Sequence, residues 1–211
     1  MLGANDGILS TGALLLGVIG AGGDRTAVLT AGLAGLAAGA GSMAMGEYVS
    51  VSSQRDTEKA DRAMEARELA TDPAGELAEL RGIYESRGLD AELAQQVAVQ
   101  LTSENALETH LRDELGLTDA LAAQPIQAAV SSFFSFTVGA LLPLLAAGFF
   151  TTSGAGIAVV TATLMGLLLL GGIGAQLGGA SIGRGALRVG VGGALALALT
   201  FGVGALIGVA I

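Results

Sequence analysis

The longest uncharged stretch of the chain runs from Ala120 to Gly183, and its 64 consecutive residues include no Asp, Glu, Lys or Arg. A soluble core of this size has no need of such a stretch, whereas two bilayer crossings of about 20 residues each require one. Of the 211 residues, 52% are hydrophobic and only 14% are charged, far from the balance of an ordinary soluble domain. The sequence therefore predicts an all-α, multi-pass integral membrane protein.

Five segments are long and apolar enough to cross a bilayer. They are residues 7–23, 26–51, 126–148, 155–175 and 189–211. The start, MLGANDGILS, has no basic residue ahead of its apolar stretch, so we expect no cleaved signal peptide. Because the first segment is short, we also expect a few preceding residues to complete that helix.

Nearly all of the charge lies in residues 54–119, where 16 acidic and 7 basic residues give a net charge of -9. We therefore divide the chain into transmembrane helices 1 and 2 (residues 1–53), an acidic helical module (54–119) and transmembrane helices 3 to 5 (120–211). The acidic balance argues against nucleic acid or anionic lipid as a partner and favours cations.

Basic residues also predict the orientation in the membrane. They cluster after the second span, at Arg55, Lys59, Arg62 and Arg67, and between the fourth and fifth spans, at Arg184 and Arg188. With five spans these two clusters share one side of the membrane, which the positive-inside rule makes cytoplasmic. We therefore expect the acidic module in the cytosol.

Turn and capping signals divide the module into short helices. A helix over residues 76–87 is expected to end at Gly88, a favourable helix C-terminus. Asp90 is expected to cap the next helix, and Ser103 to begin a last one that Gly116 closes. The sequence thus predicts a three-helix module inserted between spans two and three.

Candidate ligands for a cation lie at the ends of the spans. Met43 and Glu47 are four residues apart and share a helix face, and Asp6 lies on the same side of the membrane. Adding a thioether to carboxylates favours first-row transition metals over magnesium or calcium. Asp6 could instead cap a helix and Met43 could be a packing residue, but a carboxylate such as Glu47 after 21 uncharged residues indicates function.

The module offers further oxygen and nitrogen ligands at helical spacing. Glu76 and Glu79 are three residues apart, and the last helix carries two pairs at a four-residue step, Glu104 with Glu108 and His110 with Glu114. For each single Glu, the alternative is a solvated acidic face.

Other chemistries lack their motifs. There is no cysteine, which excludes Cys-ligated metal sites and disulfides. The sequence has no Walker A loop, G-x-S-x-G elbow or H-E-x-x-H motif and no Glu-x-x-His pair of di-iron bundles. The one histidine cannot form a triad by itself, so we expect neither an enzyme nor a prosthetic group.

Four segments resemble the vacuolar iron transporter (VIT) family, also called nodulin-21-like. They are NDGILSTGALLLGV, LTAGLAGLAAGAGSMAMGEYVSVSSQRDTEKAD, ELAELRGIYESRGL and HLRDELGL. The resemblance covers essentially the whole chain. It implies a homodimer of five-span subunits with a cytoplasmic metal-binding module, and proton-coupled antiport of ferrous iron, often manganese too, out of the cytosol.

The resemblance also assigns residues. It implies a transport path through Asp6, Met43 and Glu47, and module ligands at Glu76, Glu79 and Glu114, with further acidic ligands near Asp90 and Glu92. Where plant members carry methionines, this chain has His110 and Leu111, so its ligand set is richer in imidazole and oxygen.

Together these observations favour an antiporter in which the module captures the metal and the membrane residues exchange it for protons. A membrane-anchored metal buffer or sensor is one alternative, and a cation uniporter without proton coupling is another. The expected ion is Fe2+, with Mn2+, Co2+ and Zn2+ left open, and the other expected partners are protons, a second subunit and membrane lipid. We expect the plasma membrane in a prokaryote and the vacuolar membrane in a eukaryote.

Overall fold

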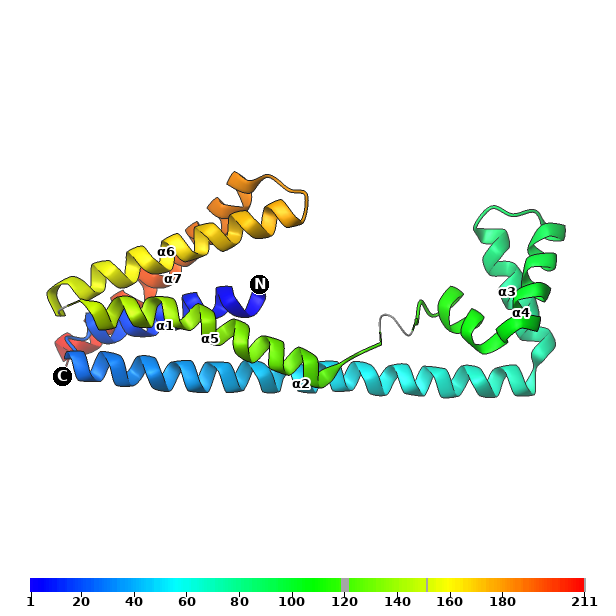
Figure 1. The fold of residues 1–211 in the computed structure, drawn as a ribbon, viewed down its shortest axis with the longest axis horizontal. Helices are drawn as coiled ribbons and strands as arrows, with labels where there is room; N and C mark the ends of the chain where they lie inside the picture. Colours follow the sequence, from blue (N-terminus) through cyan, green and yellow to red (C-terminus); the bar gives the residue numbers. More distant parts are fainter. Residues whose placement is uncertain (119–121, 151, 211) are drawn as a thin grey trace. The chain divides into compact units, whose positions relative to one another are not determined.

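The computed structural model describes residues 1–118, 122–150 and 152–210. These residues form seven α-helices and no strand (Figure 1): α1 (Leu2–Gly20), α2 (Arg25–Thr71), α3 (Pro73–Ser86), α4 (Ala91–Asp113), α5 (Pro125–Phe149), α6 (Thr152–Leu177) and α7 (Ile182–Ala210). Helices α1, α2, α5, α6 and α7 are long and apolar enough to span a membrane. The predicted all-α fold with five spans is confirmed.

Two compact units make up the chain. Unit 1 comprises Met1–Tyr48 and Ile126–Ile211, and unit 2 comprises Val49–Pro125. Helix α2 contributes to both, because the division falls within it.

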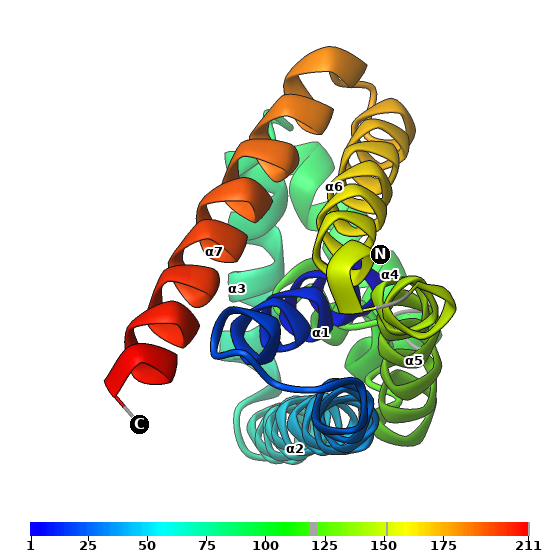
Figure 2. The same ribbon diagram turned by 90° about the vertical axis from the view of Figure 1, so that its left-hand side faces the viewer.

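Unit 1 is a bundle in which α6 and α7 form a hairpin and α1 lies beside them (Figure 2). Small residues let the backbones of these helices touch. A Cβ atom on Gly139 of α5 would collide with the carbonyl oxygen of Ala4, and one on Gly204 of α7 with the carbonyl oxygen of Gly17. Helix α1 therefore packs against α5 near its start and against α7 near its end.

A buried apolar cluster joins four of the spans. Leu15 of α1, Val28 of α2, Leu144 and Ala147 of α5 and Val159 of α6 pack together. Each is apolar and sits on a helix that is apolar on most faces, as expected of spans that meet both protein and lipid.

Two helix boundaries differ from the expected ones. Helix α1 begins at Leu2 with Met1 as N-cap, so Asp6 lies inside the helix, and its interpretation as a cap is wrong. Helix α7 begins at Ile182, so Arg184 and Arg188 lie in its first two turns rather than in a connection. Arginine is a good helix former, and its long side chain can place its charge in water while the backbone belongs to a span. The two arginines were therefore a poor guide to where α7 begins.

The helix ends in unit 2 follow local capping rules. The Asp72 side chain accepts a hydrogen bond of 2.9 Å from Gly75 N at the start of α3, and Pro73 supplies a preformed first turn. Asp90 accepts one of 2.9 Å from Leu93 N at the start of α4, as predicted. Gly88 and Gly116 have positive φ angles of 99° and 69°, which suits glycine at a helix end.

Helix α4 is interrupted at Asn105, whose φ and ψ are -159° and 90°. The Asn105 side chain accepts a 3.2 Å hydrogen bond from Glu108 N, so it caps the segment that follows. The last helical segment therefore begins after Asn105, two residues later than the predicted Ser103. Between α3 and the first part of α4, a small core forms around Leu80 and Ala94.

Candidate metal centre

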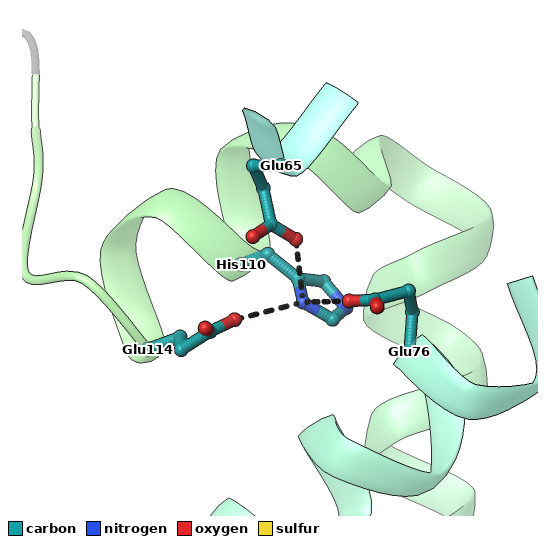
Figure 3. Close-up of side chains that lie close together, drawn as sticks. All are labelled: Glu65, Glu76, His110 and Glu114. Carbon is teal, nitrogen blue, oxygen red and sulfur yellow. Dashed lines mark hydrogen bonds and ion pairs between the residues drawn. The ribbon is translucent and has the colours of Figure 1, made fainter. Parts of the chain in front are cut away.

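Four side chains of unit 2 converge on one point (Figure 3): Glu65 from α2, Glu76 from α3, and His110 and Glu114 from the end of α4. One ligand atom from each lies within 4.8 Å of every other. Carboxylate oxygens and an imidazole nitrogen are ligands of first-row divalent metals. The group therefore has the composition and the spacing of a metal site.

The Nδ1 atom of His110 is the centre of this group. It lies 3.0 Å from Glu65 Oε1, 3.5 Å from Glu76 Oε2 and 3.3 Å from Glu114 Oε2. A ring nitrogen carries at most one proton, so it can donate to only one of the three carboxylates. Without another cation or further protons, at least two carboxylates face each other unneutralised.

Burial makes this arrangement costly for free charges. The side chains of His110 and Glu65 are 0% and 1% exposed, and His110 Nε2 has no hydrogen-bond partner among the described residues. Burial, and next the charge of Glu114, raise the pKa of Glu65 to about 7. Burial and the charge of Glu79 raise the pKa of Glu76. The cluster therefore favours uptake of protons or of a metal ion.

A second group of polar contacts holds the end of α4 against α3, next to the cluster. The Asp113 carboxylate accepts hydrogen bonds from Tyr84 Oη at 2.7 Å and from Arg87 Nη1 at 3.0 Å. Arg87 also donates to the Asp113 carbonyl oxygen at 2.7 Å. Since Asp113 directly precedes Glu114, these contacts help to fix the ligand position.

The predicted module ligands separate into two groups. Glu76, His110 and Glu114 lie in the cluster, and the others do not. Glu79 is exposed on α3, Glu108 forms an ion pair with Arg62, Asp90 caps α4, and Glu92 is exposed in its first turn. A helical spacing places side chains on one face, but it does not say which face meets another helix.

Glu65 was not among the metal ligands predicted from the sequence. A signal for it exists, because the E-x-x-E spacing of Glu76 and Glu79 also occurs at Glu65 and Glu68. The polar extension of α2 offered no apolar stripe to show which of its carboxylates would be buried. Its position in the cluster comes from the packing of α2 against α4.

Unit 1 contains a separate cavity of about 300 Å3, lined by Asp6 of α1, Met43 of α2 and Phe136 of α5 among others. The buried Thr11 also lines it, and its hydroxyl has no hydrogen-bond partner among the described residues. Glu47, one turn beyond Met43, is part-buried but is not a lining residue. Of the three residues predicted to form the transport path, the structure thus brings Asp6 and Met43 together, beside the unpaired hydroxyl of Thr11.

The family model described as the VIT family matches residues 1–205. The chain belongs to the VIT family. An Acanthamoeba castellanii protein named vacuolar iron transporter is 44% identical over 97% of this chain and 76% of its own length. A rice protein named vacuolar iron transporter homolog 1 is 39% identical over 96% of this chain and 70% of its own. The Arabidopsis thaliana protein named vacuolar iron transporter homolog 4 is 35% identical over 99% of this chain and 82% of its own.

Membership in the VIT family makes this chain a transporter rather than an enzyme. It also agrees with five spans and an integral membrane location. Among the described residues, the cluster around His110 has a donor set suited to a metal ion.

Proposed function

We propose that this VIT-family protein exports ferrous iron, and manganese as a second substrate, from the cytosol in exchange for protons. The observation that carries the metal part of the proposal is the convergence of three carboxylates on the buried imidazole of His110. A divalent ion bound there would balance charges that burial leaves unscreened. The Acanthamoeba castellanii relative is named a vacuolar iron transporter, which supports Fe2+ as the substrate.

Proton coupling is supported by the chemistry of the same groups. A metal ion binds the deprotonated carboxylate and the neutral imidazole, so metal and protons compete for the same atoms. Glu65, with a pKa near 7, changes protonation in the range in which cytosol and an acidic compartment differ. Metal binding at the cluster therefore releases protons, and acidification reverses it.

The membrane step is assigned to Asp6, Met43 and Glu47. Carboxylates within membrane helices are costly and are retained for ion or proton transfer. The cavity lined by Asp6 and Met43 provides space for an ion, and the softer thioether favours a transition metal such as iron over magnesium. In this scheme, the module, which we place in the cytosol, captures the ion with Glu65, Glu76, His110 and Glu114. The membrane residues then carry it across.

A homodimer is part of the proposal. Helix α2 is the least buried of the five spans in the single chain, and Leu33, Met45 and Val49 are exposed along it. A second copy packed on this helix would cover them. Lipid would cover the same residues in a monomer, so the subunit count needs its own measurement.

The alternative of a membrane-anchored metal buffer or sensor uses only the cluster. It does not account for a cavity with Asp6 and an unpaired Thr11 hydroxyl inside the membrane-spanning unit. A uniporter would use both sites without proton exchange.

The test is uptake of Fe2+ by sealed proteoliposomes under anaerobic conditions, with and without an acidic lumen, following lumenal pH in the same vesicles. The proposal expects uptake that accelerates with the acidic lumen and dissipates the pH gradient. Uptake that leaves the gradient unchanged would establish a uniporter, and binding without uptake would establish the buffer.

A further inference from the structure

A second, larger cavity lies in unit 1 at the junction of α6 and α7, on the side of the N-terminal turns of α1. Its volume is about 690 Å3, and its polar lining residues are Asn5, Ser181, Arg184 and Arg188. No acidic residue lines it. It is distinct from the cavity at Asp6 and Met43 and has the opposite charge.

The two arginines are unpaired within the described part of the chain. Neither Arg184 nor Arg188 forms an ion pair or hydrogen bond with a described residue. The remaining arginine of unit 1, Arg25, donates a 2.7 Å hydrogen bond to the Gly148 carbonyl oxygen. Two guanidinium groups, one helical turn apart, thus line the same cavity without a counter-ion.

Backbone groups add to the positive potential. Helix α7 begins at Ile182, directly after Ser181, and its first N–H groups have no partner within the helix. Such a helix start favours an anion. Asn5 of α1 also lines the cavity, and a side-chain amide can donate to the same anion.

The cavity lies where two of the membrane spans end, and lipid headgroups are found at the ends of spans. The spans Gly154–Leu177 and Ile182–Val209 are separated by only residues 178–181, so the junction is the end of both spans. Basic pockets between transmembrane helices at this level bind phosphate-bearing headgroups. The planar guanidinium of arginine matches a phosphate group with two parallel hydrogen bonds.

We propose that this cavity binds the phosphate of an anionic membrane lipid, held between Arg184 and Arg188. The acidic balance of the whole chain does not oppose this, because unit 1 carries only 3 acidic and 3 basic residues and none of the acidic ones lines the cavity. The lipid would connect α1 to the α6–α7 hairpin from the membrane side.

The test is native mass spectrometry of the full chain in detergent, titrated with phosphatidylglycerol or with phosphatidylcholine. Wild-type protein should retain phosphatidylglycerol preferentially. The double variant Arg184→Gln/Arg188→Gln should weaken that binding about tenfold or more. Arg25→Gln removes one positive charge elsewhere in unit 1 and should leave phosphatidylglycerol binding unchanged. Equal binding by the double variant, or equal loss in Arg25→Gln, would overturn the proposal.

A cavity-filling variant guards against misfolding of the double variant. A Cβ atom on Gly178 would meet no atom nearer than 3.5 Å, so Gly178→Leu starts its side chain without a backbone clash, occupies part of the cavity and keeps both arginines. It should also lose phosphatidylglycerol, and retention would count against the site. Titration with inorganic phosphate distinguishes a lipid headgroup from free phosphate as the ligand. Binding of phosphate without any preference for phosphatidylglycerol would overturn the lipid assignment.

Discussion

His110 determines what kind of ion its cluster can hold. One neutral nitrogen and three carboxylates give a divalent ion a mixed nitrogen and oxygen shell. Such a shell suits iron, manganese, cobalt or zinc better than the all-oxygen shells of calcium and magnesium. The complete burial of the imidazole keeps water from competing for Nδ1. Selectivity among these four metals then depends on how far the carboxylates can adjust around a fixed ring.

We expect Glu65→Gln to weaken metal binding by about tenfold or more, because it removes one of three carboxylates from a buried site. Isothermal titration of the full chain with Mn2+ or Co2+ measures the change. Glu92→Gln is the matched control, since it removes the same charge from an exposed turn of the same unit. Equal affinities in the two variants would remove Glu65 from the ligand set.

The raised pKa of Glu65 also predicts how stability depends on pH in the absence of metal. Its carboxyl binds protons more tightly in the folded protein, at a pKa of about 7, than at its ordinary value of 4.5. Its contribution to stability is therefore complete below about pH 4.5 and is lost as the pH rises through about 7.

Calorimetry of chelator-treated protein should show a melting temperature that falls between about pH 5 and about pH 8. This decrease in melting temperature with pH should be smaller in Glu65→Gln and the same as in the wild type in Glu92→Gln. Saturating Mn2+ should remove the fall in the wild type, because the metal neutralises the cluster. A wild-type melting temperature that does not fall in this range would contradict the assignment.

At the scale of elements, Asp113 joins the end of α4 to α3. Hydrogen bonds from Arg112, Tyr84 and Arg87 hold the pKa of Asp113 well below its ordinary value. Its contribution to stability is therefore present above about pH 4 and is lost as the pH falls further, the reverse of Glu65.

We expect Asp113→Asn to reduce the local stability of α3 and α4 by about 1–3 kcal/mol, because the buried Tyr84 hydroxyl and the part-exposed Arg87 and Arg112 lose a charged acceptor. Hydrogen exchange of the full chain resolves these helices. Glu85→Gln breaks the exposed 3.2 Å ion pair with Arg81 and should cost no more than about 0.5 kcal/mol. If the two variants exchanged alike, the Asp113 contacts would have no special role.

Close backbone contact between α1 and α7 predicts a sharp difference between two glycines of one helix. At Gly204 an added Cβ would meet the Gly17 carbonyl oxygen, whereas at Gly202 it would meet nothing within 4 Å. Gly204→Ala should therefore destabilise the bundle by about 1–3 kcal/mol, and Gly202→Ala should not. Thermal stability in detergent, followed by size-exclusion chromatography, compares the two directly.

For the whole molecule, the proposal separates capture from translocation, and transport kinetics can distinguish them. Asp6→Asn and Glu47→Gln should reduce the maximal rate of Fe2+ uptake at least about tenfold, because they alter the membrane path itself. Glu65→Gln should instead raise the Fe2+ concentration needed for half-maximal uptake. If the cluster variant lowered the maximal rate as much as the membrane variants, the cluster would belong to the translocation step.

Local properties of the sequence determined much of the molecule. The five spans follow from apolar length alone, and the start of α4 at Asp90 and the end of α3 at Gly88 follow from capping rules that act within a few residues. The four-residue step between His110 and Glu114 likewise placed both on one helix face. Such features need no knowledge of distant segments.

Tertiary structure alone decided which polar residues meet. Glu65 and His110 are far apart in the chain, and the burial that raises the Glu65 pKa exists only once α2 and α4 pack together. Arg184 and Arg188 were expected in a connection, yet they begin a span and share a cavity with Asn5 of α1. Hydrophobicity and helix propensity are sums over neighbouring residues, whereas desolvation and charge repulsion depend on which distant side chains the fold brings into contact.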